Sequence, residues 1–76
     1  MSFIKVDYSL SDFPRDRVEM VNMSNVEHIN ITSAVIEMRM VSGAVLAVLK
    51  SQNARLYKSV RHQIESGFGY TFEGSL

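Results

Sequence analysis

The chain has 76 residues, of which 46% are hydrophobic, with eight basic and eight acidic side chains and no cysteine. Its length fits one small domain over residues 1–76, and its apolar content favours a packed core over disorder. The lack of cysteine excludes disulfides and thiolate sites, and the formal net charge of zero argues against a general nucleic-acid coat.

No segment suggests membrane insertion or export. The longest uncharged apolar stretch, residues 40–49, is about half of the ~20 residues that span a bilayer. The first ten residues mix charged and apolar side chains and contain no signal-type hydrophobic run. We therefore expect a cytoplasmic protein that does not associate with a membrane.

The first predicted element is a half-buried strand over residues 3–8. Ile4, Val6 and Tyr8 alternate with Lys5 and Asp7, and a period of two with one polar side is typical of such a strand.

The following segment, residues 14–24, supports two interpretations. Pro14 suits the first turn of a short helix, which would give the chain a split-βαβ arrangement. The alternation of Val18 and Met20 around Glu19 fits a strand instead, and we favour the strand.

A β-hairpin is predicted over about residues 34–50. Ile36 and Met38 alternate with Glu37 and Arg39, and Gly43 stands where a two-residue turn would need glycine. Residues 44–50 could also begin one long helix, but the three cap-type residues at 51–53 indicate that a new element starts there. As a strand, residues 44–50 are apolar on both faces, which favours a central strand covered on both sides.

An amphipathic helix is predicted over about residues 52–66. Leu56, Tyr57, Val60 and Ile64 fall within one arc of about 100°. Gly67 stands just past the expected end, as a C′ residue does.

Together these elements predict an α+β fold, in which a small antiparallel sheet of three to five strands packs against the C-terminal helix. A short aromatic strand or ordered tail over residues 68–72 would follow. The split-βαβ arrangement remains an alternative.

Two groups of side chains are candidate binding residues. The first is the basic set, which suits phosphates or an acidic partner but would also serve simply as the solvated side of an amphipathic helix. Its members are Lys50, Arg55, Lys58, Arg61 and His62. The second is the aromatic strip, which suits base stacking, an interface or ordinary core packing. Its members are Phe68, Tyr70 and Phe72.

Metal binding and catalysis have no sequence support. His28 and His62 are the only histidines, and a metal site needs three or four ligands. His28 has only the adjacent Glu27, and His62 lies one turn from Glu65 on a basic face that would oppose a cation. No Gly-x-Ser-x-Gly elbow or phosphate-binding loop occurs. We expect no metal, no cofactor and no enzymatic activity.

These observations favour a small non-catalytic protein–protein interaction module, such as an inhibitor, adaptor or accessory regulator. It would act through a sheet edge or through the basic face of its C-terminal helix. A homodimer is expected, because a small apolar-rich domain can bury surplus apolar surface against a second copy. The alternative is a nucleic-acid-binding protein that uses the basic helix and the aromatic strip over residues 68–72.

Overall fold

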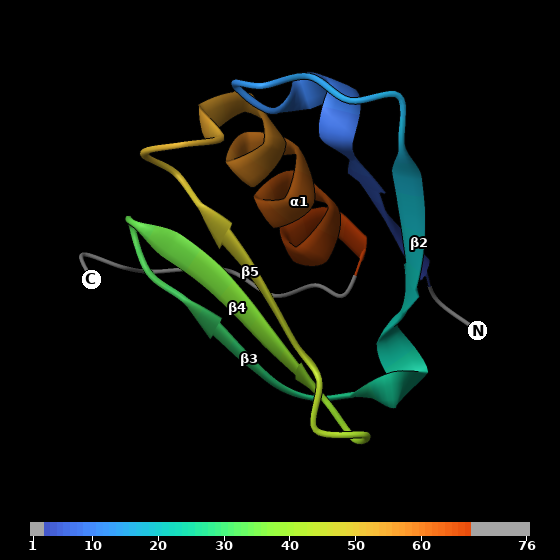
Figure 1. Ribbon diagram of the computed structural model, residues 1–76. Coiled ribbons are helices and arrows are strands. Elements are labelled where there is room, and N and C mark those ends of the chain that lie inside the picture. The colour runs from blue at the N-terminus through green and yellow to red at the C-terminus, as the bar shows by residue number, and fades with distance from the viewer. Residues whose placement is uncertain (1–2, 68–76) are drawn as a thin grey trace.

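The strands form two small antiparallel sheets, as Figure 1 shows for the computed structural model, which describes residues 3–67. The N-terminal sheet consists of β1 (Phe3–Asp7) and β2 (Val18–Asn22). The hairpin sheet has the order β3-β4-β5 and consists of β3 (Val26–Ile31), β4 (Val35–Met40) and β5 (Val45–Leu49). Helix α1 (Ala54–Gly67) follows, so the α+β class is confirmed.

The strand interpretation of residues 14–24 is confirmed. They contain β2, and α1 is the one α-helix among residues 3–67, so the split-βαβ alternative is wrong. Pro14 starts no helix and lies in the connection between β1 and β2. β2 instead pairs along its whole length with β1, from Phe3 opposite Asn22 to Asp7 opposite Val18.

Both strands of the N-terminal sheet end in the same local motif. The Asp7 carboxylate accepts the N–H of Ser9 at 3.0 Å and caps the 3₁₀ turn η1 (Tyr8–Leu10). The Asn22 side chain accepts the N–H of Ser24 at 3.0 Å and caps the turn η2 (Met23–Asn25). Asp and Asn favour such turns because their short side chains reach the backbone two residues later.

The predicted hairpin is present as β4 and β5, with a turn one residue longer than expected. Gly43 N–H donates to the Met40 carbonyl at 2.9 Å, and Met40 N–H donates to the Ala44 carbonyl at 2.8 Å. Gly43 has φ +94°, a conformation that glycine adopts without a Cβ clash. The loop is thus the three-residue type, which places its glycine in the left-handed region.

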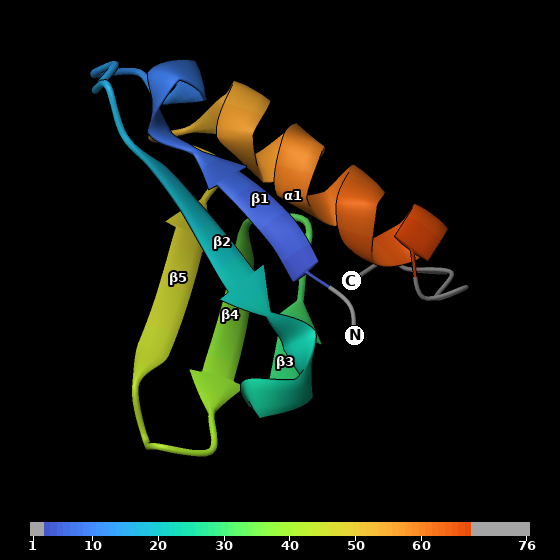
Figure 2. The same ribbon diagram turned by 90° about the vertical axis from the view of Figure 1, so that its right-hand side faces the viewer.

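Helix α1 completes the core. Figures 1 and 2 show it beside both sheets, and it contacts β1, β4 and β5. The four residues of its predicted apolar arc are all buried. The strands contribute the remaining buried side chains, which are Ile4, Val6, Val21, Ile31, Ile36, Met38 and Val48.

Strand β5 corrects one prediction. Its apolar character on both faces favoured a central strand, but β5 lies at the edge of the hairpin sheet. Val48 faces the core, whereas Val45 and Leu49 remain 61% and 41% exposed. Within residues 3–67, one face and one edge of this apolar strand are therefore uncovered.

Two further expectations concern residues 68–72 and the membrane. The strand or tail predicted over residues 68–72 lies outside the described residues. Within residues 3–67, no helix is long and apolar enough to cross a membrane.

Candidate functional site

The basic set divides into two groups on α1. Arg55, Lys58 and His62 are exposed and lie one turn apart on the side opposite the core. Neither Arg55 nor Lys58 forms an ion pair with any other residue in the described range 3–67. This group is the solvated face that the helical periodicity predicts.

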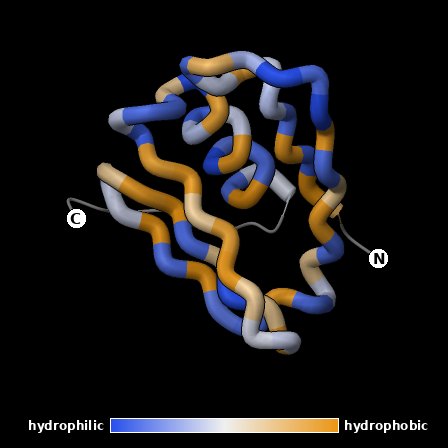
Figure 3. Tube along the Cα trace, in the orientation of Figure 1, coloured by the Kyte–Doolittle hydropathy of each residue, from blue (hydrophilic) through white to orange (hydrophobic). Residues whose placement is uncertain are grey.

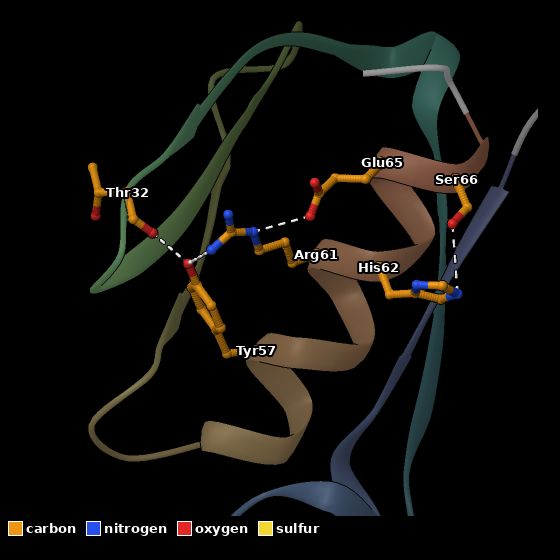
Figure 4. A network of polar contacts seen from close by, with 6 residues as sticks. All are labelled: Thr32, Tyr57, Arg61, His62, Glu65 and Ser66. Atoms are coloured by element: carbon orange, nitrogen blue, oxygen red, sulfur yellow. Dashed lines mark hydrogen bonds and ion pairs between the residues drawn. The ribbon is translucent and has the colours of Figure 1, made fainter. Parts of the chain in front are cut away.

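Arg61 belongs to a polar network at the core boundary, which Figure 4 shows. Its Nε donates to the Glu65 carboxylate at 3.0 Å, and its Nη1 donates to the Tyr57 hydroxyl at 3.2 Å. The Tyr57 hydroxyl in turn donates to the backbone carbonyl of Thr32, which joins α1 to the end of β3. Arg61 thus supports Tyr57, whose hydroxyl makes the contact from α1 to the hairpin sheet.

This environment favours the charged form of Arg61. Burial opposes the charged form, but the hydrogen bond to the Tyr57 hydroxyl and the ion pair with Glu65 outweigh it and raise the pKa of Arg61. The guanidinium also lies over the Tyr57 ring, with 6.0 Å between Cζ and the ring centroid.

Lys50 is drawn to the same ring. Its Nζ lies 5.7 Å from the centroid of Tyr57, which is itself 1% exposed. Three of the five basic-set residues, Arg55, Lys58 and His62, therefore face outward together. Lys50 and Arg61 both lie near the ring of the buried Tyr57.

The histidines form no metal centre. His62 lies 3.5 Å from the Ser66 hydroxyl through its Nε2, as Figure 4 shows, and His28 is on the exposed face of β3. Among residues 3–67, no group of three or more His, Cys, Asp and Glu side chains could hold a metal ion. The aromatic strip, Phe68, Tyr70 and Phe72, lies outside the described residues.

The sheet edges provide the second candidate surface, and the edge of β1 is closed by α1. The Gln63 side chain accepts the backbone N–H of Lys5 at 2.7 Å and donates to the backbone carbonyl of the same residue at 2.7 Å. The amide thus makes the two hydrogen bonds that a neighbouring strand would make. Edge strands present unpaired backbone groups, and covering them prevents unwanted pairing.

The edges of β2 and β3 carry charge. Glu19 on β2 pairs with Arg17, and Glu27 on β3 pairs with Arg39 at 3.0 Å. The register of β3 also shifts between Val26 and His28, which marks a bulge or irregularity. Charges and bulges both disfavour the addition of another strand.

In the part of the chain that the structure describes, the edge of β5 has none of these protections. It contains no charged residue, no proline and no register shift. Figure 3 shows it as a run of apolar colour, whereas the neighbouring strands alternate with hydrophilic residues. An apolar edge of this kind is a site for pairing with another chain.

The ladder shows which backbone groups of β5 do not bond to β4. Lys50 N–H donates to the Ala34 carbonyl at 2.9 Å. In an antiparallel pair every second residue hydrogen-bonds to the neighbouring strand, so the residues of β5 that bond to β4 are those at even positions, counted back from Lys50. The residues between them, Val45, Ala47 and Leu49, turn their N–H and C=O groups away from β4. Their side chains also share the outward face of the sheet.

A shallow open groove continues this apolar face. Its volume is about 750 Å³, and it is lined by the apolar side chains of Val35, Ala47 and Leu49 together with polar and charged residues, among them Glu37 and Lys50. It lies open on the sheet surface, so it suits the side chains of an added strand rather than an enclosed small molecule.

Sequence reasoning missed Gln63 and the edge position of β5. An amide has no periodic signature that reveals its partner, and the only available signal for β5 was its uncharged run between Met40 and Lys50. No protein family, no curated protein and no solved structure matches this chain.

Proposed function

We propose that this protein is a small non-catalytic protein–protein interaction module that binds an extended segment of a partner along the β5 edge. One observation carries the proposal. β5 is an edge strand with the composition of a central strand, whereas the edges of β1, β2 and β3 are capped or charged.

Strand addition supplies both affinity and specificity. The free N–H and C=O groups of Val45 and Ala47 offer four backbone hydrogen bonds to a new strand. Alternate side chains of that strand would cover Val45 and Leu49, which are now largely exposed. We expect the partner segment to be extended and apolar at every second position, and its affinity to depend little on salt.

The backbone of Ala47 offers a direct test. Its N–H points away from β4, so Ala47→Pro removes one free donor without removing a hydrogen bond of the β4–β5 ladder. Val45→Lys places a charge on the same edge. Val18→Lys is the matched control, because Val18 is an exposed strand valine on the N-terminal sheet.

Displayed nine-residue peptides would be selected on the immobilised wild-type protein and then titrated against each variant. We expect apolar-alternating peptides whose binding falls at least about tenfold with Ala47→Pro and Val45→Lys, but not with Val18→Lys. Selected peptides that bind both edge variants as well as the wild type would refute the proposal.

The exposed group Arg55, Lys58 and His62 supports a second candidate, nucleic-acid binding or docking of an acidic protein. Arg55→Glu with Lys58→Glu is the appropriate reversal, because reversing Arg61 would also break its contacts with Tyr57 and Glu65. A gel shift with oligonucleotides at low salt tests the first form. No shift at about 50 μM protein, well above specific affinities, would remove it.

The expected homodimer belongs to this proposal, and its support is the same uncovered edge. Cytoplasmic location and the absence of enzymatic activity stay predictions from the sequence.

A further inference from the structure

We propose that the strand added at the β5 edge is β5 of a second copy, so that the protein is a homodimer with one continuous six-stranded sheet. The inference rests on the proposed function, because it names the occupant of the same edge. It follows from the free backbone groups, the charge pattern and the symmetry of an antiparallel strand pair.

The backbone selects one register. The carbonyl of Leu49 already accepts N–H groups from Asn53 at 2.9 Å and Gln52 at 3.2 Å, so the chain turns across the edge at that point. Among residues 3–67, the groups of this edge that have no partner belong to Val45 and Ala47. A two-fold axis at Leu46 places Val45 of each copy opposite Ala47 of the other and makes four hydrogen bonds between the strands.

The side chains are self-complementary in this register. Val45 meets Ala47 of the second copy on the outward face, so a branched residue stands against a small one. Leu46 meets its own symmetry mate on the inner face, at a non-bonded pair where side chains approach most closely. β5 carries no charge, so no like charges meet across the axis.

The surroundings leave room for the second strand. In Figure 1 no helix or strand of residues 3–67 lies in front of β5, and in Figure 2 β5 stands at the margin of this part of the chain. The two-fold axis of an antiparallel pair is perpendicular to the sheet, so both copies of α1 would lie on the same side. The exposed groups of Arg55, Lys58 and His62 would then form a bivalent surface.

The small area of the interface limits the affinity of the two copies for each other. A strand pair this short buries less than the roughly 1,200–2,000 Å² of a standard interface. We expect a dissociation constant of about 10⁻⁶ to 10⁻⁴ M, which is weak enough for both species to be observed in one titration.

Sedimentation equilibrium of the full chain from about 1 μM to about 1 mM would test this range. We expect a monomer–dimer equilibrium that weakens at least about tenfold with Ala47→Pro or Val45→Lys and is unchanged by Val18→Lys. Circular dichroism would confirm that each variant is folded, and Val45→Lys serves if Ala47→Pro is not. In the wild type, hydrogen exchange at the Ala47 amide should slow as the concentration rises.

Two results would overturn the inference, namely a wild-type protein that stays monomeric at about 1 mM, or a dimer that both edge variants leave intact. If the wild type is monomeric but peptides still require the Ala47 edge, the homodimer fails and the proposed strand-binding function stands. If peptides bind without that edge, the proposed function itself fails.

Discussion

Replacing Gln63 by alanine should loosen α1 from β1. The substitution removes two hydrogen bonds of 2.7 Å to the backbone of Lys5. A neutral hydrogen bond contributes about 0.5–1.5 kcal/mol net, and water can reach the exposed Lys5 backbone, so we expect a loss of about 1–2 kcal/mol. In a domain of this size that lowers Tm by about 5–15 °C.

Urea unfolding followed by circular dichroism measures this loss. Lys58→Ala is the matched control, because Lys58 is an exposed residue of the same helix and its intrinsic helix propensity is close to that of glutamine. We expect the control to change stability by less than about 0.5 kcal/mol. If Gln63→Ala is no more destabilising than Lys58→Ala, the bonds to Lys5 do not stabilise the fold.

Gln63→Glu distinguishes the hydrogen bond that the Gln63 side chain donates to Lys5 from the one that it accepts. The introduced carboxylate still accepts the N–H of Lys5, but it can no longer donate to the Lys5 carbonyl. Protonation restores a donor, so this variant should recover stability relative to the wild type as the pH falls through the pKa of the new carboxyl. A variant whose stability relative to the wild type is independent of pH would contradict this geometry.

Three further predictions concern the core and the polar contacts. Tyr57→Phe should cost about 1–2 kcal/mol in urea unfolding, because it removes the bond to the Thr32 carbonyl; a loss below about 0.5 kcal/mol would count against the network. The Met38 side chain has no exposed surface, so Met38→Ala should lower the free energy of unfolding by about 2–5 kcal/mol. The total free energy of unfolding of a domain this size is about 4–11 kcal/mol. A near-neutral variant would mean that Met38 is not part of the core. Hydrogen bonds from the Ser9 hydroxyl and, to a smaller extent, from the Ser9 N–H lower the pKa of Asp7. The ionised Asp7 therefore stabilises the fold above the ordinary pKa of aspartate, and this stabilisation is lost as the pH falls through the lowered pKa of Asp7. Asp7→Asn should therefore weaken the acid dependence of stability measured by urea unfolding below about pH 5, and an unchanged dependence would exclude this contribution.

The inner faces of several elements could be predicted from local pattern. Ile36 and Met38 alternate with polar neighbours, and both are fully buried. The apolar arc of α1 likewise lies in the core because residues three and four apart share one side of a helix. Local sterics set these periods, so a short window of sequence carries the information.

The candidate surfaces were less accessible to such reasoning. Arg61 falls on the polar arc, yet it is tied to Tyr57 and Glu65. Gln63 and Lys5 are 58 residues apart, and nothing in either neighbourhood marks the pair. Side chains of this kind find their partners only when the helix has been placed against a sheet.

The sequence by itself favoured an apolar strand over residues 44–50 rather than the start of one long helix, and it predicted a helix over about residues 52–66 with one apolar side. These properties depend on neighbouring side chains. The tertiary structure decided that β5 lies at an edge. Strand order depends on pairing between distant segments, and here that pairing separates β1 and β2 into their own sheet. Among residues 3–67, an apolar strand suited to cover on both sides thereby has a free edge, which is the physical basis for expecting a partner there.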